Sequence, residues 1–312
     1  MQLRKKILSE YFAENPNVLR DRKVVVMAGP PGAGKSSARR DRISASEEQH
    51  WRFIDPDEFK TRLLRHARQT GEYDSLIPPE VQARIAAGEK FAPGEFASLV
   101  HEESSAIARM AVETSVNRGE RVVIDGINGS TKKITARIDE LATHGYTDID
   151  IICVDGPRDV TRARVINRWA DGYSQFEGGN DAGFNARYVP EHITDELYRD
   201  EQRFSSCTRA TAEATRAARE PLNVRADIYY VDDPNGAAVL WKSYRKDGEG
   251  AFTHKTHQKI QPIAARTSPG AAPATSPVAA ADGGGGGGEI YVAGYTRADG
   301  VHVAGYTRKR AT

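Results

Sequence analysis

One glycine-rich run after an apolar stretch constrains this chain more than any other feature. Residues 29–36 read Gly-Pro-Pro-Gly-Ala-Gly-Lys-Ser, which fits the phosphate-binding loop pattern of Gly, four residues, Gly, Lys and then Ser or Thr. The apolar residues 24–28 are typical of a buried strand, and residues 37–42 can begin a helix. Strand, loop and helix in this order predict an α/β fold with a phosphate site.

The residue types of this loop suit a polyphosphate. Gly32 and Gly34 permit backbone angles that a Cβ would forbid, so backbone N–H groups can surround anionic oxygens at the positive end of the next helix. We expect Lys35 to reach the β- and γ-phosphates. We expect the Ser36 hydroxyl to complete the shell of a Mg2+ ion that keeps most of its waters. The alternative is a glycine-rich turn that binds nothing.

Composition narrows the class of protein. The chain has 312 residues, enough for one large or two small domains, and its formal net charge of +1 argues against nucleic-acid binding. Cys153 and Cys207 lack paired spacing, so neither a disulfide scaffold nor a zinc site is indicated. The sequence shows no signal peptide and no apolar run near the ~18 residues of a membrane helix. We therefore expect a cytoplasmic enzyme without membrane contact.

Strand-like and helix-like runs alternate from residue 23 to about residue 246. The strand-like runs after the first lie at 52–55, 121–125, 149–155, 226–231 and 238–241. The last two are expected to pair across a turn at 233–236. This alternation predicts a mostly parallel sheet flanked by helices, as in P-loop NTPase-type folds. We assign this domain to residues 1–248.

The composition changes abruptly after residue 248. The segment 249–288 contains an Ala/Pro/Ser/Thr-rich stretch and then an unbroken glycine run, and we expect a flexible, disordered linker. Residues 289–312 form a tail in which Val-Ala-Gly-Tyr-Thr-Arg occurs at 292–297 and again at 303–308. The tail could form a β-hairpin around the turn Asp299-Gly300. Because an isolated hairpin is marginal in water, a disordered tail is the preferred interpretation.

Acidic residues follow two of the expected strands. The carboxyl ends of parallel strands face the ligand crevice, so Asp55 or Asp57 could accept the proton of a substrate hydroxyl. An aspartate before a helix is also a common N-cap. Asp55, which precedes Pro56, suits a cap, and Asp57 suits the site, although spacing alone does not decide. Asp125 could bind substrate or hold the metal through water, or it could be a turn aspartate.

Arginines flank a Gly-rich polar segment at 172–183, which suits a mobile lid. Arg168 and Arg187 could clamp a transferring phosphoryl group when such a lid closes. Arg162 is expected to be a solvated helix charge, and Arg164 stays open between the two interpretations.

Several motifs in one order resemble the zeta toxin family. They lie at 29–37, 54–60 (Ile-Asp-Pro-Asp-Glu-Phe-Lys), 123–126 (Val-Ile-Asp-Gly), 167–169 and 186–190, and residues 227–230 fit the family's terminal strand. The resemblance covers about residues 20–246 and not the tail. It implies a P-loop kinase that transfers phosphate from ATP to the 3′-hydroxyl of the amino sugar in UDP-N-acetylglucosamine. It also implies a small antitoxin protein that blocks the ATP site.

The resemblance further implies a role for each matching residue. Lys35 would bind the ATP phosphates, and Asp57, rather than Asp55, would be the catalytic base. Arg168 and Arg187 match two arginines that stabilise the transferring group. Asp125 matches an acid of the substrate pocket, whereas Ile127 departs from a frequent Thr. The ATP-binding loop would comprise Gly29, Pro30, Pro31, Gly32, Ala33, Gly34, Lys35, Ser36 and Ser37, with Ser36 on Mg2+.

Two other functions remain compatible with the sequence. The first is a P-loop kinase for another acceptor, such as a nucleotide, an antibiotic or a polynucleotide end. A polynucleotide would favour a basic groove, and the nearly neutral charge argues against it. The second is a nucleotide-gated binding module that acts through its tail.

Overall fold

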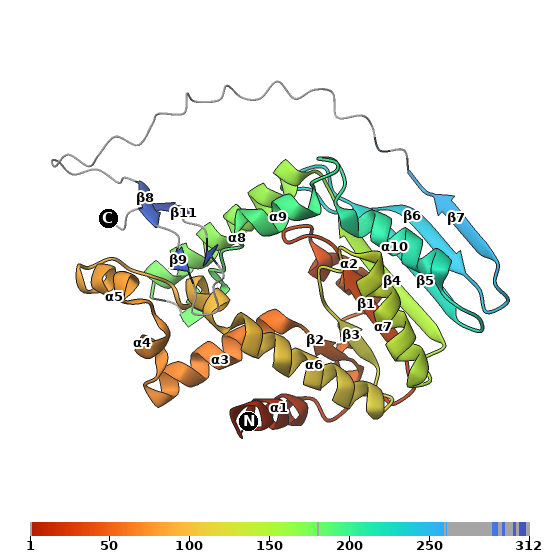
Figure 1. Cartoon of the computed structure of the whole chain (residues 1–312), viewed down its shortest axis with the longest axis horizontal. Helices are drawn as coiled ribbons and strands as arrows, with labels where there is room; N and C mark the ends of the chain where they lie inside the picture. Colours follow the sequence, from red (N-terminus) through yellow and green to blue (C-terminus); the bar gives the residue numbers. More distant parts are fainter. Residues whose placement is uncertain are drawn as a thin grey trace. The chain divides into compact units, whose positions relative to one another are not determined.

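A seven-stranded sheet organises the first of two compact units, Met1–His257 (Figure 1). In this computed structural model the sheet order is β2-β3-β1-β4-β5-β6-β7. The strands are β1 (Val24–Ala28), β2 (Arg52–Ile54), β3 (Val122–Ile124), β4 (Asp148–Asp155), β5 (Asn223–Tyr230), β6 (Val239–Lys246) and β7 (Phe252–Thr256). Neighbours from β2 to β5 are parallel, and β6 and β7 add antiparallel strands. The predicted α/β class and mostly parallel sheet are confirmed.

The structure describes residues 2–179, 181–258 and 260, and the backbone of 289–292, 295–296, 302–303 and 306–309; at 181 and 182 it describes the backbone alone. The α-helices are α1 (Gln2–Glu14), α2 (Lys35–Arg42), α3 (Pro56–Thr70), α4 (Tyr73–Leu76), α5 (Pro79–Ala86), α6 (His101–Asn117), α7 (Thr131–Thr143), α8 (Arg158–Glu177), α9 (Glu191–Leu197) and α10 (Ser206–Ala217). Short 3-10 helices lie at Glu48–His50, Pro93–Val100 and Asp181–Asn185. Of these described helices, none has the length and apolar character to span a membrane.

The alternation of side chains along the strands decides which helix covers which face. Met27 of β1 packs with Ala38 of α2. Ala28, the next residue, points to the other face and packs with Cys153 and with Cys207 of α10. Helices α2 and α10 therefore cover opposite faces of the sheet. All five residues of β1 are buried, as expected for a central parallel strand with helices on both sides.

Helix α8 includes the first part of the segment that the sequence suggested as a lid. It runs to Glu177, so residues 172–177 are helical. A Cβ on Gly172 would lie 2.7 Å from the backbone nitrogen of Ala186, so this glycine permits close packing of the chain. Tyr173 is buried and its hydroxyl donates to the Lys90 carbonyl at 3.0 Å. The segment 172–177 is therefore the end of a helix and not an irregular loop. Tyr173 anchors it to the core, whereas Ser174, Gln175 and Glu177 are exposed. A lid that closes over the site stays a prediction.

The sheet also extends beyond the boundary expected at residue 248. Strand β7 pairs antiparallel with β6, with Phe252 opposite Lys246. Residues 249–257 thus belong to the first unit and do not begin a linker. The rest of the expected linker, from residue 261 to 288, lies outside the described residues.

Residues Gln258–Thr312 form the second unit. Within it, β8 (Glu289–Val292) pairs antiparallel with β11 (Tyr306–Lys309), and β9 (Tyr295–Thr296) pairs antiparallel with β10 (His302–Val303). Val292 opposes Tyr306 and Tyr295 opposes Val303, so the two pairs share one register. One antiparallel register is compatible with a hairpin of the two repeats, which stays a prediction. The expected turn Asp299-Gly300 lies outside the described residues.

Candidate active site

The glycine-rich loop joins the carboxyl end of β1 to the first turn of α2. Gly29 has φ 135° and Gly32 has φ 80°, a region that side chains with a Cβ rarely adopt. A Cβ on Gly29 would lie 2.1 Å from the Val154 carbonyl oxygen, and one on Gly32 would lie 2.2 Å from the Thr161 carbonyl oxygen. Both positions therefore require glycine because the loop presses against β4 and α8.

Lys35 lies between this loop and the carboxyl end of β3. Its Nζ donates to the Gly29 carbonyl at 3.0 Å and lies 3.9 Å from Asp125 Oδ1. The Asp125 carboxylate in turn accepts the backbone N–H of Gly126 at 2.7 Å. The ammonium of Lys35, from the start of α2, and the carboxylate of Asp125, which follows β3, thus meet at the mouth of the loop. Ser36 is the second residue of α2, beside the loop's backbone N–H groups.

Asp55 and Asp57 have different local roles. Asp55 is the N-cap of α3, and its Oδ1 accepts the backbone N–H of Asp57 at 2.8 Å, which confirms the expected cap. Asp57 lies in the first turn of α3, and each of its carboxylate oxygens faces a cation. Lys60 Nζ lies 2.9 Å from Oδ1, and Arg187 Nη1 lies 3.4 Å from Oδ2.

These environments shift the pKa values of the two aspartates in opposite directions. Burial, and next the negative charges of Asp125 and Asp57, raise the pKa of Asp55 to about 6. Burial would also raise the pKa of Asp57, but Lys60 and Arg187, aided by Arg168, lower it to about 2. Asp57 is therefore charged at neutral pH, whereas Asp55 titrates about one pH unit below neutrality.

Arg187 contributes buried, charged donors to this region. Its Nε and Nη1 are buried, and neither finds a hydrogen-bond acceptor among the described residues. Leaving a buried donor without an acceptor costs about 1–3 kcal/mol, and more when the group is charged. The ion pair with Asp57 offsets part of this cost. Donors of this kind suit an anionic group that arrives with a substrate.

Arg162 and Arg164, on the same helix α8, do not join this cluster. Arg162 pairs with Glu191, and both side chains are exposed, as expected for a solvated charge. Arg164 donates to the Ala33 carbonyl of the loop at 3.2 Å and to the Pro234 carbonyl at 2.8 Å. It also donates to the Gly236 carbonyl. Arg164 therefore ties the phosphate-binding loop to the β5–β6 turn.

Ile127 packs its partly buried side chain against the core cluster that contains Cys207. Its carbonyl accepts the backbone N–H of Gly29 at 2.9 Å. Asn128, at φ 52°, donates from Nδ2 to the Met27 carbonyl at 2.7 Å. The segment after β3 thus fastens the end of β1 where the loop begins.

The sequence interpretation missed two residues of the region, Lys60 and Asn128. Spacing could have suggested Lys60, because residues three apart share a helix face and Asp57 precedes it by three. Nothing local to the sequence marks Asn128 as the residue that holds β1. The predicted site residues Lys35, Asp57, Asp125, Arg168 and Arg187 all contribute to one electrostatic cluster at the carboxyl ends of β1, β2 and β3.

A parallel sheet with a phosphate-binding loop between β1 and α2 defines a P-loop NTPase-type protein. The zeta toxin family model matches residues 9–246. The chain therefore belongs to the zeta toxin family, a family of P-loop kinases. The comparison with curated proteins found no match.

Solved forms of one complex show the same fold at low sequence identity. A complex of AvrRxo1-ORF1 and AvrRxo1-ORF2 with ATP is 16% identical over 81% of this chain and 68% of that chain, with a TM-score of 0.52. The native form of that complex gives 0.51 at the same identity and coverage. A chain from the PezAT chromosomal toxin-antitoxin system of Streptococcus pneumoniae is 14% identical over 76% of this chain and 78% of that chain, with a TM-score of 0.44.

Proposed function

We propose that this protein is an ATP-dependent kinase for a sugar nucleotide, and that its acceptor is the 3′-hydroxyl of the amino sugar in UDP-N-acetylglucosamine. Membership of the zeta toxin family supports the kinase class. A protein of the same fold has been solved with ATP, which supports this phosphate donor. The observation that carries the proposal is that the Asp57 carboxylate faces Arg187. The buried Nε and Nη1 donors of Arg187 have no hydrogen-bond acceptor among the described residues, so they could bind an anionic group.

The loop side of the site would bind ATP. The loop N–H groups and Lys35 would surround the β- and γ-phosphates, with Lys35 exchanging the Gly29 carbonyl for phosphate oxygens. The Ser36 hydroxyl and the Asp125 carboxylate are hard oxygen donors of the kind that Mg2+ takes, directly or through water. Mg2+ would neutralise charge on the β- and γ-phosphates when bound. Arg164 would hold the loop in a fixed position relative to the β5–β6 turn.

The strand-end side of the site would act on the acceptor. Asp57 would accept a hydrogen bond from the acceptor hydroxyl and orient its oxygen toward the γ-phosphorus. As the new O–P bond forms, the bond to the β,γ-bridging oxygen breaks, ADP leaves and the hydroxyl proton passes to Asp57. Because the transition state is loose, a low pKa at Asp57 is compatible with a role that is mainly orientation. Arg168 and Arg187 would neutralise the transferring phosphoryl group.

The direct test incubates the purified full chain with ATP, Mg2+ and UDP-N-acetylglucosamine, and looks for a phosphate added to the sugar nucleotide by mass spectrometry. Lys35→Ala should give no product. Lys132→Ala, an exposed lysine on α7, is the matched control and should give wild-type product. Product from wild type and control alone supports the proposal. ATP binding without any phosphorylated sugar nucleotide would reject this acceptor while leaving the kinase class intact.

We also propose that a small antitoxin protein covers the ATP site, on the strength of the family membership. Expression of the wild-type chain in a bacterial host should then arrest growth, whereas Lys35→Ala should not. Growth arrest by both forms would dissociate toxicity from phosphoryl transfer and remove the basis for an inhibitor of the ATP site.

A further inference from the structure

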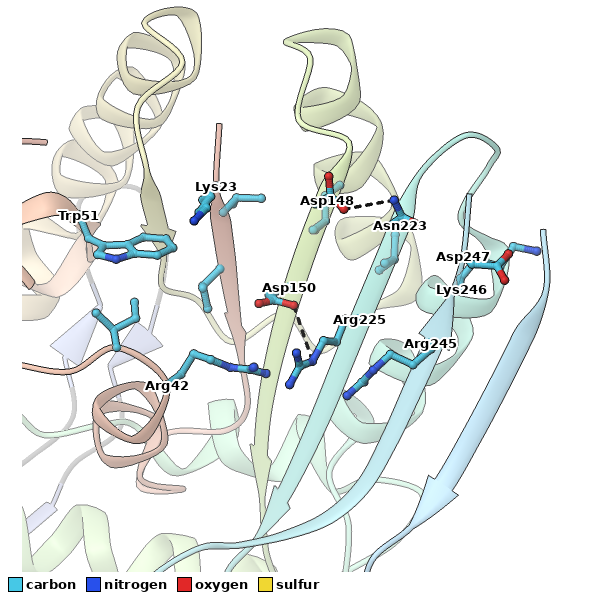
Figure 2. Close-up of a pocket in the computed structure, with 15 residues that line it drawn as sticks. Lys23, Arg42, Trp51, Asp148, Asp150, Asn223, Arg225, Arg245, Lys246 and Asp247 are labelled. Carbon is cyan, nitrogen blue, oxygen red and sulfur yellow. Dashed lines mark hydrogen bonds and ion pairs between the residues drawn. The ribbon is translucent and has the colours of Figure 1, made fainter. Parts of the chain in front are cut away.

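A cavity of about 530 Å3 lies away from the phosphate-binding loop (Figure 2). It opens over the amino ends of β1, β4 and β5, whereas the loop follows the carboxyl end of β1. None of the proposed catalytic residues lines it. Its volume falls within the range of about 300–1,000 Å3 that is usual for small-molecule sites.

The end of helix α2 borders the cavity. This helix has eight residues and ends at Arg42, which lies in the cavity wall. The sheet face beyond that end carries polar side chains in register. Asp150 of β4 lies opposite Arg225 of β5, and Arg225 lies opposite Arg245 of β6. Figure 2 shows these side chains projecting from neighbouring strands toward the end of α2.

Three arginines converge on one buried carboxylate beneath this surface. Asp227, 2% exposed, accepts from Arg42 Nη2 at 2.5 Å and from Arg225 Nη2 at 3.2 Å. Arg245 Nη2 donates to the same carboxylate at 2.9 Å. Asp150 supplies a second carboxylate, 3.9 Å from Arg225 Nε. Lys23 and Lys246 add two ammonium groups to the cavity wall, and Asp148 and Asp247 add two carboxylates. Five cations thus face four carboxylates, Asp227 included. Guanidinium groups donate in a planar fork that matches phosphate and carboxylate, so the excess charge favours an anion of that shape.

The other side of the cavity is apolar. Trp51 forms its wall opposite Arg225 and Arg245, with Arg42 between them (Figure 2). Ile43, the residue after α2, also lies in the cavity wall. A ligand that fills this space therefore needs a flat or apolar portion on the Trp51 side and an anionic group on the arginine side.

We propose that this cavity is a second ligand site, separate from the ATP site, for an anionic small molecule of the nucleoside monophosphate class. The phosphate group lies against Arg225 and Arg245, and the base lies toward Trp51. The ion pairs with Asp227 hold the guanidinium groups in place before the ligand arrives, which reduces the conformational entropy that binding costs.

The three tryptophans of the chain allow a site-resolved test. The full chain is labelled with 5-fluorotryptophan, and each fluorine signal is assigned by a single Trp→Phe variant. Trp51 reports the cavity, and Trp169, next to Arg168, reports the ATP site. Trp241, which stacks on Phe204 at 4.8 Å, reports neither. Adenosine 5′-monophosphate is the probe, and uncharged adenosine is its control.

The Trp51 signal should shift saturably with adenosine 5′-monophosphate at about millimolar concentration or below, and not with adenosine. Arg225→Gln should weaken this binding at least about tenfold, because one charge-assisted fork is lost. Arg225 is 45% exposed, so the variant should fold, and an unchanged fluorine spectrum before titration verifies this. Arg209→Gln, an exposed arginine on α10, is the matched control and should bind as wild type.

Two results would overturn the proposal. The first is a Trp51 signal that does not respond to adenosine or uridine 5′-monophosphate. The second is a response that is equal in wild type and Arg225→Gln, because the arginines would then not hold the ligand.

Discussion

The proposed mechanism makes Asp57, and not Asp55 two residues before it, the acid that orients the acceptor, and this assignment gives the strictest test of the mechanism. Asp57→Asn keeps the size of the side chain and removes its charge. The carboxylate that would orient the acceptor, 2.9 Å from Lys60 and 3.4 Å from Arg187, is then lost. We expect kcat to fall about 10²–10⁴-fold, the usual contribution of a positioned base. The KM for ATP should change little, because the variant leaves the phosphate-binding loop intact.

The pKa values determine how this loss can be separated from unfolding. The pKa of Asp57 falls from 3.8 to about 2, so its charge stabilises the fold above pH 4 and this stabilisation is lost as pH falls toward 2. Because the side chain is 38% exposed, solvent screening limits the stabilisation to ~1 kcal/mol. At pH 7 the variant should therefore stay folded, and its lost activity should reflect chemistry.

The assay measures steady-state kinetics and urea unfolding for wild type, Asp57→Asn and Asp55→Asn at pH 7. Asn is as good an N-cap as Asp, so Asp55→Asn should keep both the fold and kcat within about threefold. The assignment of Asp57 as the orienting acid is refuted if Asp57→Asn turns over normally. It is also refuted if Asp55→Asn loses as much kcat as Asp57→Asn while both bind ATP normally, since Asp55 would then have to be the orienting acid.

Three further predictions concern stability, each measured by urea unfolding. The pKa of Asp55 is raised to about 6, so the free energy of unfolding of the wild type should decline as pH rises from about 4 to 6. Asp55→Asn should remove up to ~3 kcal/mol of that decline. Parallel curves of unfolding free energy against pH for the two proteins would contradict this. Gly29→Ala should cost at least ~2 kcal/mol, because its Cβ would lie 2.1 Å from a backbone oxygen of β4, whereas Gly71→Ala, with open space around it, should cost ~1 kcal/mol; equal losses would count against the packing argument. Arg52→Ala should cost ~3 kcal/mol by leaving the buried carboxylate of Glu120 without its main partner, and a loss below ~1 kcal/mol would show that the pair is not effectively buried.

Local patterns made much of the fold predictable. The loop between β1 and α2 follows from the local spacing of Gly29, Gly34, Lys35 and Ser36. The parallel sheet follows from short apolar runs that alternate with helical ones. Asp55 before Pro56 is a cap in the structure, as its neighbours along the chain require. Each of these features depends on residues within a few positions of one another, so the chain carries the signal locally.

Contacts between distant segments decided the rest. Arg187 reaches Asp57 across 130 positions of sequence, and Arg164 joins two loops that are far apart along the chain. The polar composition of 172–177 suggested a lid, but packing against distant residues made it part of α8.

The same holds for the surroundings of both sites. Which side chains Ile127 contacts depended on tertiary packing, and it packs, partly buried, against the core cluster that contains Cys207. The arginine-lined cavity depends on the register of β4, β5 and β6 and on where α2 ends. The sequence alone thus determined the phosphate loop and the class of fold, because sterics and side-chain periodicity act between neighbouring residues. Only the tertiary structure decided which charges meet, because strand register and helix packing bring together residues that no local pattern connects.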